Sequence, residues 1–532
     1  MRARRSFWLF LVSLASLGLY ALLALRYPLR RSLADPRASW ASMVEPSVPN
    51  AALHIAIYLG LTLLYLAALR LVTHPQPEPE KGRSSRPQTA IIAITWLAGC
   101  AVLLLVAPAG ESHDIYDYIF RGRMMTEYHA NPLTDVPNSF GLAAPYTRFI
   151  AWRKNVDTYG PVWEALSAAV SYGVRGTSQW LGWWDETHPV CPKSTESCRL
   201  LIVYVTGYRL LAISLTGLSG WLIVSIVRRS RAWMAPVALA AWLLNPMTLV
   251  ATALGGHNDA VMLVLVLLAW WLLQREQPLL ALLSLILAAH VKLTALIWLP
   301  PGAVWILRRW GWKGALRIGV LGAVSGLVLS WLLYAPLGGW ETLPRMLHER
   351  SQLMANSPWF VVKRVLVQWW YWSPGYAQQF SVNIAYWISA IVALLVPLWI
   401  FNFRPRRWRS APIPPEESDQ KLWRALAVVS MLYLSVGAFW FQHWYVLWAL
   451  APAVLLPRSR TLHTVLAWLA FGALTSNLVM SFLFATLLEN TKSLVIYVVP
   501  VVIIWGPALV AVSIHLLTRQ RRRAMTRDSI AA

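Results

Sequence analysis

Long apolar segments separated by short polar ones recur from one end of the 532-residue chain to the other. A helix needs about twenty apolar residues to cross the hydrocarbon core of a bilayer. By that criterion the pattern predicts about fourteen transmembrane helices, some of them short enough to be tilted or broken around a cavity. The predicted spans are residues 7–25, 51–72, 90–108, 200–227, 235–254, 259–274, 279–290, 292–307, 314–335, 382–402, 425–441, 444–457, 463–488 and 493–517. The expected fold class is therefore an all-α polytopic membrane protein.

Charge adds an orientation to this picture. Only 13% of the residues are charged, whereas soluble domains carry about 25%. The net charge of +24 is spread over short basic clusters that flank apolar runs, as the positive-inside rule expects of cytoplasmic loops. This distribution argues against nucleic-acid binding. It predicts a multi-pass protein of the plasma (inner) membrane with both termini in the cytoplasm.

Two long polar segments, 109–199 and 336–381, then fall on the non-cytoplasmic face. The first contains a semi-apolar stretch at 159–181, which we expect to lie in the membrane interface, because a crossing there would put the next basic loop outside. We expect three parts: two transmembrane helices and a cytoplasmic linker at 1–89, a transmembrane core with both external loops at 90–460, and C-terminal helices with a basic tail at 461–532.

Cysteine is scarce, with three residues in the chain. Cys191 and Cys198 share a polar part of the first external segment, so a disulfide between them and two free thiols are both open. A zinc site needs more ligands than this segment offers.

A carboxylate, Asp114, stands shortly after the third apolar run. A carboxylate at the edge of a membrane costs free energy unless it is used or paired. Helical spacing would bring Asp114, Tyr118 and Arg121 to one face. Such a face suits a general base beside a phosphate-binding cation. The alternative is a structural ion pair with Arg121 or Arg123.

Three further breaks between apolar runs carry polar residues. His257 and Asp259 follow a Gly-Gly pair, where they either contribute to a site or begin the next helix as caps. Lys292 separates two apolar runs and either extends toward the headgroups or holds a phosphate. His443 and Trp444 form either an interfacial anchor or a platform for a sugar.

Together these motifs resemble the GT-C superfamily of glycosyltransferases, and most closely the bacterial polytopic mannosyltransferase-type enzymes that use polyprenyl-phosphate sugars. The resemblance covers about residues 90–460. It rests on the order of the segments 114–123, 131–132, 159–161, 245–246, 256–259, 292 and 443–445.

The resemblance implies an inverting hexosyltransferase of the cell envelope. It would move a sugar, first of all a mannose-like hexose, from a polyprenyl-phosphate donor to a lipid or glycan acceptor on the non-cytoplasmic face. It also implies that Asp114 is the general base. On chemical grounds we expect Lys292, with Arg121 or Arg123, to stabilise the departing phosphate. The remaining substrate-binding candidates are Tyr118, His257, Asp259, His443 and Trp444. No cofactor is assigned, and use of a divalent metal stays open, because some relatives use one and many do not. The chain departs from many relatives in having two spans before the helix that leads into the first external loop.

The alternative is a multi-span transporter or a flippase for lipid-linked sugars, which performs no covalent chemistry. Secondary transporters often consist of repeated halves with ionisable groups near the middle of the bilayer. This sequence shows no internal repeat, and its acids gather at one face. It also lacks a P-loop, so nucleotide-driven transport has no support.

Overall fold

The computed structural model describes residues 2–34, 47–73, 86–108, 111–141, 146–182, 199–402, 414–483 and 494–531. Within these ranges the chain folds into helices and connecting turns, and they contain no β-strand. The all-α prediction is therefore confirmed. Cys191 and Cys198, and with them the proposed disulfide, lie outside the described residues.

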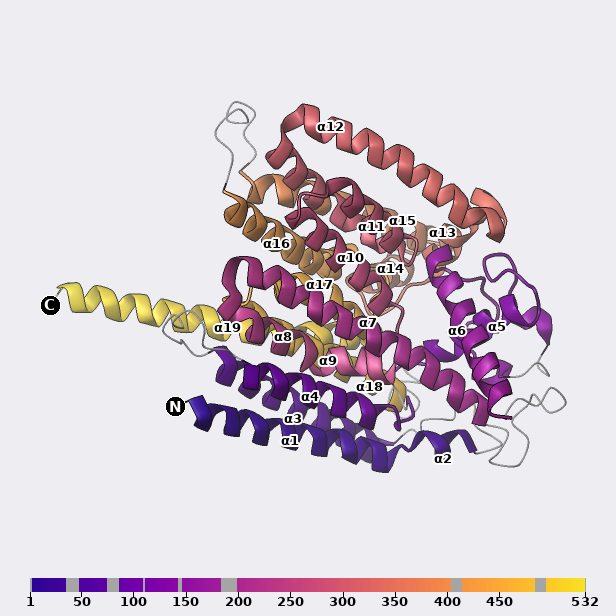
Figure 1. Ribbon diagram of the computed structural model, residues 1–532, viewed down its shortest axis with the longest axis horizontal. Coiled ribbons are helices and arrows are strands. Elements are labelled where there is room, and N and C mark those ends of the chain that lie inside the picture. Colours follow the sequence, from indigo (N-terminus) through magenta and orange to yellow (C-terminus); the bar gives the residue numbers. More distant parts are fainter. Residues whose placement is uncertain are drawn as a thin grey trace.

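Three groups of helices lie side by side along one common direction (Figure 1). One flank consists of α1 (Arg2–Arg26), α3 (Val48–Thr73) and α4 (Arg86–Leu103). The middle is formed by α7 (Arg199–Arg231), α8 (Ala235–Leu243), α9 (Pro246–Leu249), α17 (Val446–Ala453) and α18 (Arg460–Leu483). The other flank contains α10 (Asp259–Gln274), α11 (Pro278–Ala289), α12 (Leu299–Tyr334), α15 (Pro374–Ile400) and α16 (Pro415–Leu432).

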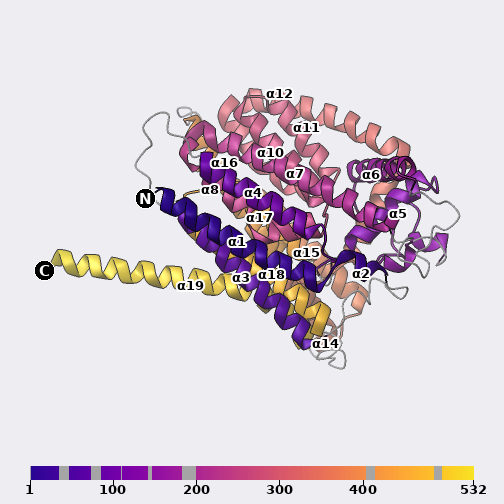
Figure 2. The same cartoon turned by 60° about the horizontal axis from the view of Figure 1, so that its bottom comes forward.

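The two ends of this bundle differ. The chain termini, including the long last helix α19 (Val495–Ala531), lie at one end (Figures 1 and 2). The two external segments predicted from the sequence lie at the opposite end. They contain α5 (Asp114–Thr126), α6 (Pro161–Trp180), α13 (Thr342–Gln352) and α14 (Pro358–Trp369). The short α2 (Leu29–Ala34) follows α1 toward this same end.

Seven segments of the described chain are long and apolar enough to cross a membrane. They are Arg4–Arg26, Val48–Thr73, Leu200–Leu243, Leu293–Leu337, Pro374–Ile400, Arg460–Ser481 and Val495–Gln520, and three shorter apolar helices are Pro87–Leu103, Asp259–Gln274 and Pro278–Ala289. The fourteen spans expected from the sequence are thus not confirmed. Two of the seven segments contain a break, at Arg231 (φ −149°, ψ 65°) and at Gly311 (φ 67°, ψ 178°). The sequence pattern counted the two sides of each break as separate spans.

Two helices end in wide π-helical turns, one before the motif at 256–259 and the other before the motif at 443–445. The first is Val250–Leu254, which follows α9 and leads through Gly256 (φ 62°) into α10. The second is Tyr433–Gly437, which follows α16 and leads into the 3-10 turn His443–Tyr445. Such turns occur frequently at functional sites, because they release the backbone from the regular helix. Here they deliver His257 and Tyr445 to the end of the bundle that carries α5.

Close packing fixes α5 against α6 and α7. A Cβ atom on Gly122 would lie 2.6 Å from the Tyr208 hydroxyl and 2.8 Å from the Ser167 carbonyl oxygen. The same Tyr208 hydroxyl donates a hydrogen bond to the carbonyl oxygen of Tyr118, at 2.8 Å. Only glycine fits at position 122, and this contact holds the helix that begins with Asp114.

Candidate functional site

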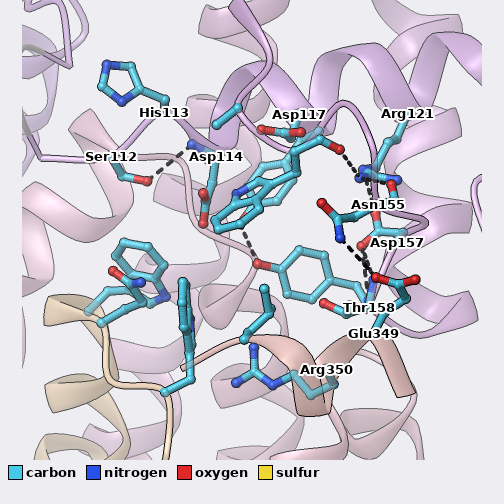
Figure 3. Close-up of a pocket in the computed structure, with 18 of the residues that line it drawn as sticks. Ser112, His113, Asp114, Asp117, Arg121, Asn155, Asp157, Thr158, Glu349 and Arg350 are labelled. Carbon is cyan, nitrogen blue, oxygen red and sulfur yellow. Dashed lines mark hydrogen bonds and ion pairs between the residues drawn. The ribbon is translucent and has the colours of Figure 1, made fainter. Parts of the chain in front are cut away.

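A cavity of about 200 Å³ opens at the end of the bundle that carries α5, α6 and α13 (Figure 3). Four stretches of chain form its wall: residues 111–121, residues 151–159, residues 349–353 on α13, and residues 440–445, with α18 contributing from below. These stretches are far apart in sequence. The two segments predicted to be external, the stretch at 440–445 and α18 therefore meet at one site.

Asp114 lies in the first turn of α5 and lines this cavity. Its backbone N–H donates to the Ser112 hydroxyl at 3.2 Å, and its side chain is 18% exposed. Burial raises the pKa of Asp114 to about 6, against the opposing effect of the nearby positive charge of Lys292. Such a carboxyl can accept a proton near neutral pH, as a general base must.

His257 stands behind this carboxylate. Its Nδ1 atom lies 4.0 Å from Asp114 Oδ2, and its ring stacks on Trp444 with a centroid separation of 3.7 Å. Burial lowers the pKa of His257 well below its usual range, so the imidazole is neutral. The ring of His443 packs edge-on against the same Trp444 at 4.8 Å. Trp444 lines the cavity, and the two histidines support it from behind.

Asp259 and Lys292 form a buried ion pair, with 2.5 Å between Nζ and Oδ2. The other oxygen of Asp259 accepts from Trp448 Nε1 at 2.6 Å, so both oxygens are engaged. The Lys292 ammonium group lies 5.1 Å from the ring centre of Tyr159 and 5.4 Å from that of Tyr445, two rings of the cavity wall. The pair thus lies one layer behind the wall and supports it.

A close backbone contact explains why Tyr159 meets Lys292. The Gly160 N–H donates to the Val291 carbonyl at 3.1 Å, and the Val162 N–H donates to the His290 carbonyl at 3.1 Å. A Cβ atom on Gly160 would lie 2.2 Å from that His290 oxygen. The motif at 159–161 and the break at 290–292 are therefore two sides of one contact.

Both arginines of the Arg121-Gly122-Arg123 motif have carboxylate partners. Arg121 Nε lies 3.3 Å from Asp157 Oδ2, and its Nη2 donates to the Asn155 carbonyl at 3.0 Å. Arg123 Nε donates to Glu127 Oε1 at 2.9 Å, and its guanidinium lies over the Tyr146 ring. Arg121 lines the cavity but Arg123 does not. Their geometry is that of the structural ion pairs considered above as the alternative to phosphate binding.

A different arginine, Arg350 on α13, faces the cavity. Its Nη2 donates to the Tyr445 hydroxyl at 2.9 Å, and the described residues place no carboxylate within ion-pair distance of it. The neighbouring Glu349 accepts from Asn155 Nδ2 at 2.9 Å, which ties α13 to the first external segment. No motif distinguishes Arg350 in the sequence, because it is one of several basic residues in a Trp-rich segment.

Tyr118 completes the predicted set. Its hydroxyl lies 3.4 Å from that of Tyr159, and both residues line the cavity. The cavity wall thus contains four of the nine candidates, Asp114, Tyr118, Arg121 and Trp444. His257, His443, Asp259 and Lys292 lie behind it. Within the described ranges no three His, Cys, Asp or Glu side chains are arranged to hold a metal ion.

Comparison with known families supports the resemblance noted above. The family model for the alpha-(1->6)-mannopyranosyltransferase N-terminal domain matches residues 9–309, more than half of the chain. A search of curated proteins finds no match. The matched region begins at residue 9 and therefore includes α3 and most of α1. The match ends before Arg350. The chain belongs to the alpha-(1->6)-mannopyranosyltransferase family and is a membrane glycosyltransferase.

Proposed function

We propose that the protein transfers a mannose-like hexose from a polyprenyl-phosphate donor to a hydroxyl group of a lipid or glycan acceptor. The transfer is a single inverting displacement on the non-cytoplasmic face of the plasma (inner) membrane, with Asp114 as the general base. One observation carries this proposal: a carboxyl group with a pKa raised to about 6 and an arginine that has no carboxylate partner among the described residues face the same cavity.

The position of the cavity supports the proposed face. It lies at the end of the bundle opposite both chain termini, next to α5, α6 and α13 (Figure 1). The last helix α19 runs into the basic stretch at 519–523, which the positive-inside rule assigns to the cytoplasm.

Arg350 is the proposed ligand of the donor phosphate. Its planar guanidinium matches two phosphate oxygens, and the Tyr445 hydroxyl holds it in place. We assign this role to Arg350 in preference to Arg121 and Arg123, whose charges are already paired. A cavity of about 200 Å³ is too small for a polyprenyl chain, so only the sugar and phosphate enter while the tail remains in the lipid.

The reaction then needs one proton transfer. An acceptor hydroxyl oxygen attacks the anomeric carbon of the donor sugar, and the bond from that carbon to the phosphate oxygen breaks. Asp114 takes the hydroxyl proton, and polyprenyl phosphate leaves with the bonding electrons. Arg350 stabilises the charge that grows on the phosphate. The Asp259–Lys292 pair acts indirectly, because Lys292 lies against the rings of Tyr159 and Tyr445. The Lys292 charge favours the ionised form of Asp114, and the Asp259 charge opposes it.

The test uses the full-length protein in lipid nanodiscs with a labelled polyprenyl-phosphate mannose and a short alkyl α-mannoside as acceptor. Chromatography should show label moving into a disaccharide, and a labelled nucleotide sugar should not replace the lipid donor. In proteoliposomes, labelled donor that crosses the bilayer without forming a covalent product would instead establish the transporter alternative.

A further inference from the structure

Part of the cavity wall consists of buried polar atoms that the mechanism above does not use. Glu111 and Trp444 both line the cavity, and each residue is 3% exposed. Glu111 Oε2 and Trp444 Nε1 are buried and have no hydrogen-bond partner among the described residues. Gln442 lines the same wall with its amide group. Buried polar atoms without partners cost free energy, which a bound polar ligand would recover.

One carboxylate oxygen of Glu111 is fixed by a hydrogen bond, and the other has no partner among the described residues. Its Oε1 atom accepts a hydrogen bond from the Tyr58 hydroxyl of α3 at 2.7 Å. Its carbonyl oxygen accepts from Asn477 Nδ2 of α18 at 2.8 Å. Two helices that take no part in the proposed chemistry therefore fix the direction of this carboxylate. A group fixed in this way binds a ligand without first losing side-chain freedom.

The position of Glu111 relative to Asp114 indicates which substrate it meets. Figure 3 shows His113 and Arg350 on opposite sides of Asp114. Glu111 precedes His113 by two residues in the chain and lines the same cavity. In an inverting displacement the nucleophile and the leaving group lie on opposite faces of the anomeric carbon. With phosphate on Arg350, the acceptor would approach from the His113 side of Asp114, next to the stretch of chain that carries Glu111.

The chemistry of the three groups agrees with this placement. A carboxylate repels an anionic phosphate but accepts hydrogen bonds from hydroxyl groups, an indole N–H only donates, and an amide does both. Neighbouring hydroxyls of a pyranose ring offer both donors and acceptors. We propose that Glu111, Gln442 and Trp444 form the subsite that binds the acceptor sugar, a neutral hydroxyl-rich pyranose. This inference rests on the proposed function, because the in-line argument uses the roles of Asp114 and Arg350.

The test separates acceptor binding from donor binding. Initial rates of the full-length protein in nanodiscs are measured against alkyl α-mannoside at saturating donor, and against polyprenyl-phosphate mannose at saturating acceptor. Glu111→Gln preserves the size of the side chain and an oxygen for Tyr58, and Trp444→Phe removes the N–H but keeps a ring against His257. We expect Glu111→Gln to raise the KM for acceptor by about tenfold or more, as loss of a hydrogen bond to a charged group would. Trp444→Phe and Gln442→Ala should raise it by about threefold, with the donor KM unchanged. Glu417→Gln, an exposed acid on α16, is the matched control.

The proposal is overturned if these variants raise the donor KM, lower kcat alone, or leave both KM values unchanged. Binding of the alkyl α-mannoside is also followed by saturation-transfer NMR, which requires no turnover. Binding by the wild type that is lost in Glu111→Gln supports the subsite even if no sugar transfer is found. Equal NMR signals from the two proteins would refute it.

Discussion

The raised pKa of Asp114 predicts an unusual dependence of the transfer rate on pH. The perturbation is a change in pH from 7.5 to 5. With a pKa of about 6, the carboxyl group is almost fully ionised at the higher pH and only about one-tenth ionised at the lower one. Since only the carboxylate can accept the proton, kcat/KM should fall about tenfold over this range. An aspartate at the ordinary value of 3.8 would remain more than about nine-tenths ionised, so the rate would hardly change.

The pKa values of His113 and Asp117, two other groups at the cavity, lie outside the range from pH 5 to 7.5. Burial lowers the pKa of His113 to about 4, so it stays neutral between pH 5 and 7.5. Burial raises the pKa of Asp117 to about 8, against the opposing charge of Arg121, so Asp117 carries a proton over most of the same range. Above pH 8, its charge would repel the donor phosphate in the shared cavity. We therefore expect a second fall in kcat/KM above pH 8, which Asp117→Asn should abolish while leaving the fall below pH 6 in place.

The assay is the initial rate of label transfer to alkyl α-mannoside from pH 4.5 to 9 at low donor concentration. Tryptophan fluorescence and size-exclusion chromatography at each pH show whether the protein remains folded. The reasoning is refuted if a folded protein changes its kcat/KM by less than twofold between pH 5 and 7.5.

Three further predictions concern the groups around the base. Arg350→Gln should raise the KM for the lipid donor by about tenfold or more, because it loses a charge-assisted contact with the phosphate. Arg345→Gln on the same helix should leave this KM unchanged, and equal effects of the two variants would contradict the assignment of Arg350 as the phosphate ligand. Lys292→Gln should lower the free energy of unfolding by about 3–5 kcal/mol, because it leaves the fully buried Asp259 carboxylate unpaired. Thermal unfolding of the double variant with Asp259→Asn should show most of this loss restored, and additive losses would contradict a coupled pair. Gly160→Ala should destabilise the protein by about 1–3 kcal/mol and reduce transfer, since its Cβ would meet the His290 carbonyl. Gly176→Ala on α6, where a Cβ meets open space, is its control, and similar losses in both would argue against the contact.

Helices and the breaks between them could be predicted from the sequence, because both depend on neighbouring residues in the chain. Apolar runs predicted the helices, and Pro246 with Gly255 and Gly256 marked the break that brings His257 to the cavity. Asp114, His257, Lys292 and Trp444 lie near one another because each stands at a break between helices on the same side of the bundle.

Partners that meet through packing could not be read from the chain. Arg121 pairs with Asp157, and Glu111 with Tyr58, across stretches in which nothing marks the pairing. Arg350 acquires its position only because α13 folds over the first external segment. The count of fourteen spans is not confirmed, because an apolar run does not show how a break such as the one at Gly311 divides a helical segment.

The most direct test of the base is single-turnover transfer by Asp114→Asn in nanodiscs loaded with labelled polyprenyl-phosphate mannose. The asparagine keeps the shape of the side chain but cannot accept the proton. The account predicts that this variant binds the donor as the wild type does and transfers its sugar at least about 100-fold more slowly. Transfer at the wild-type rate would show that a different group activates the acceptor.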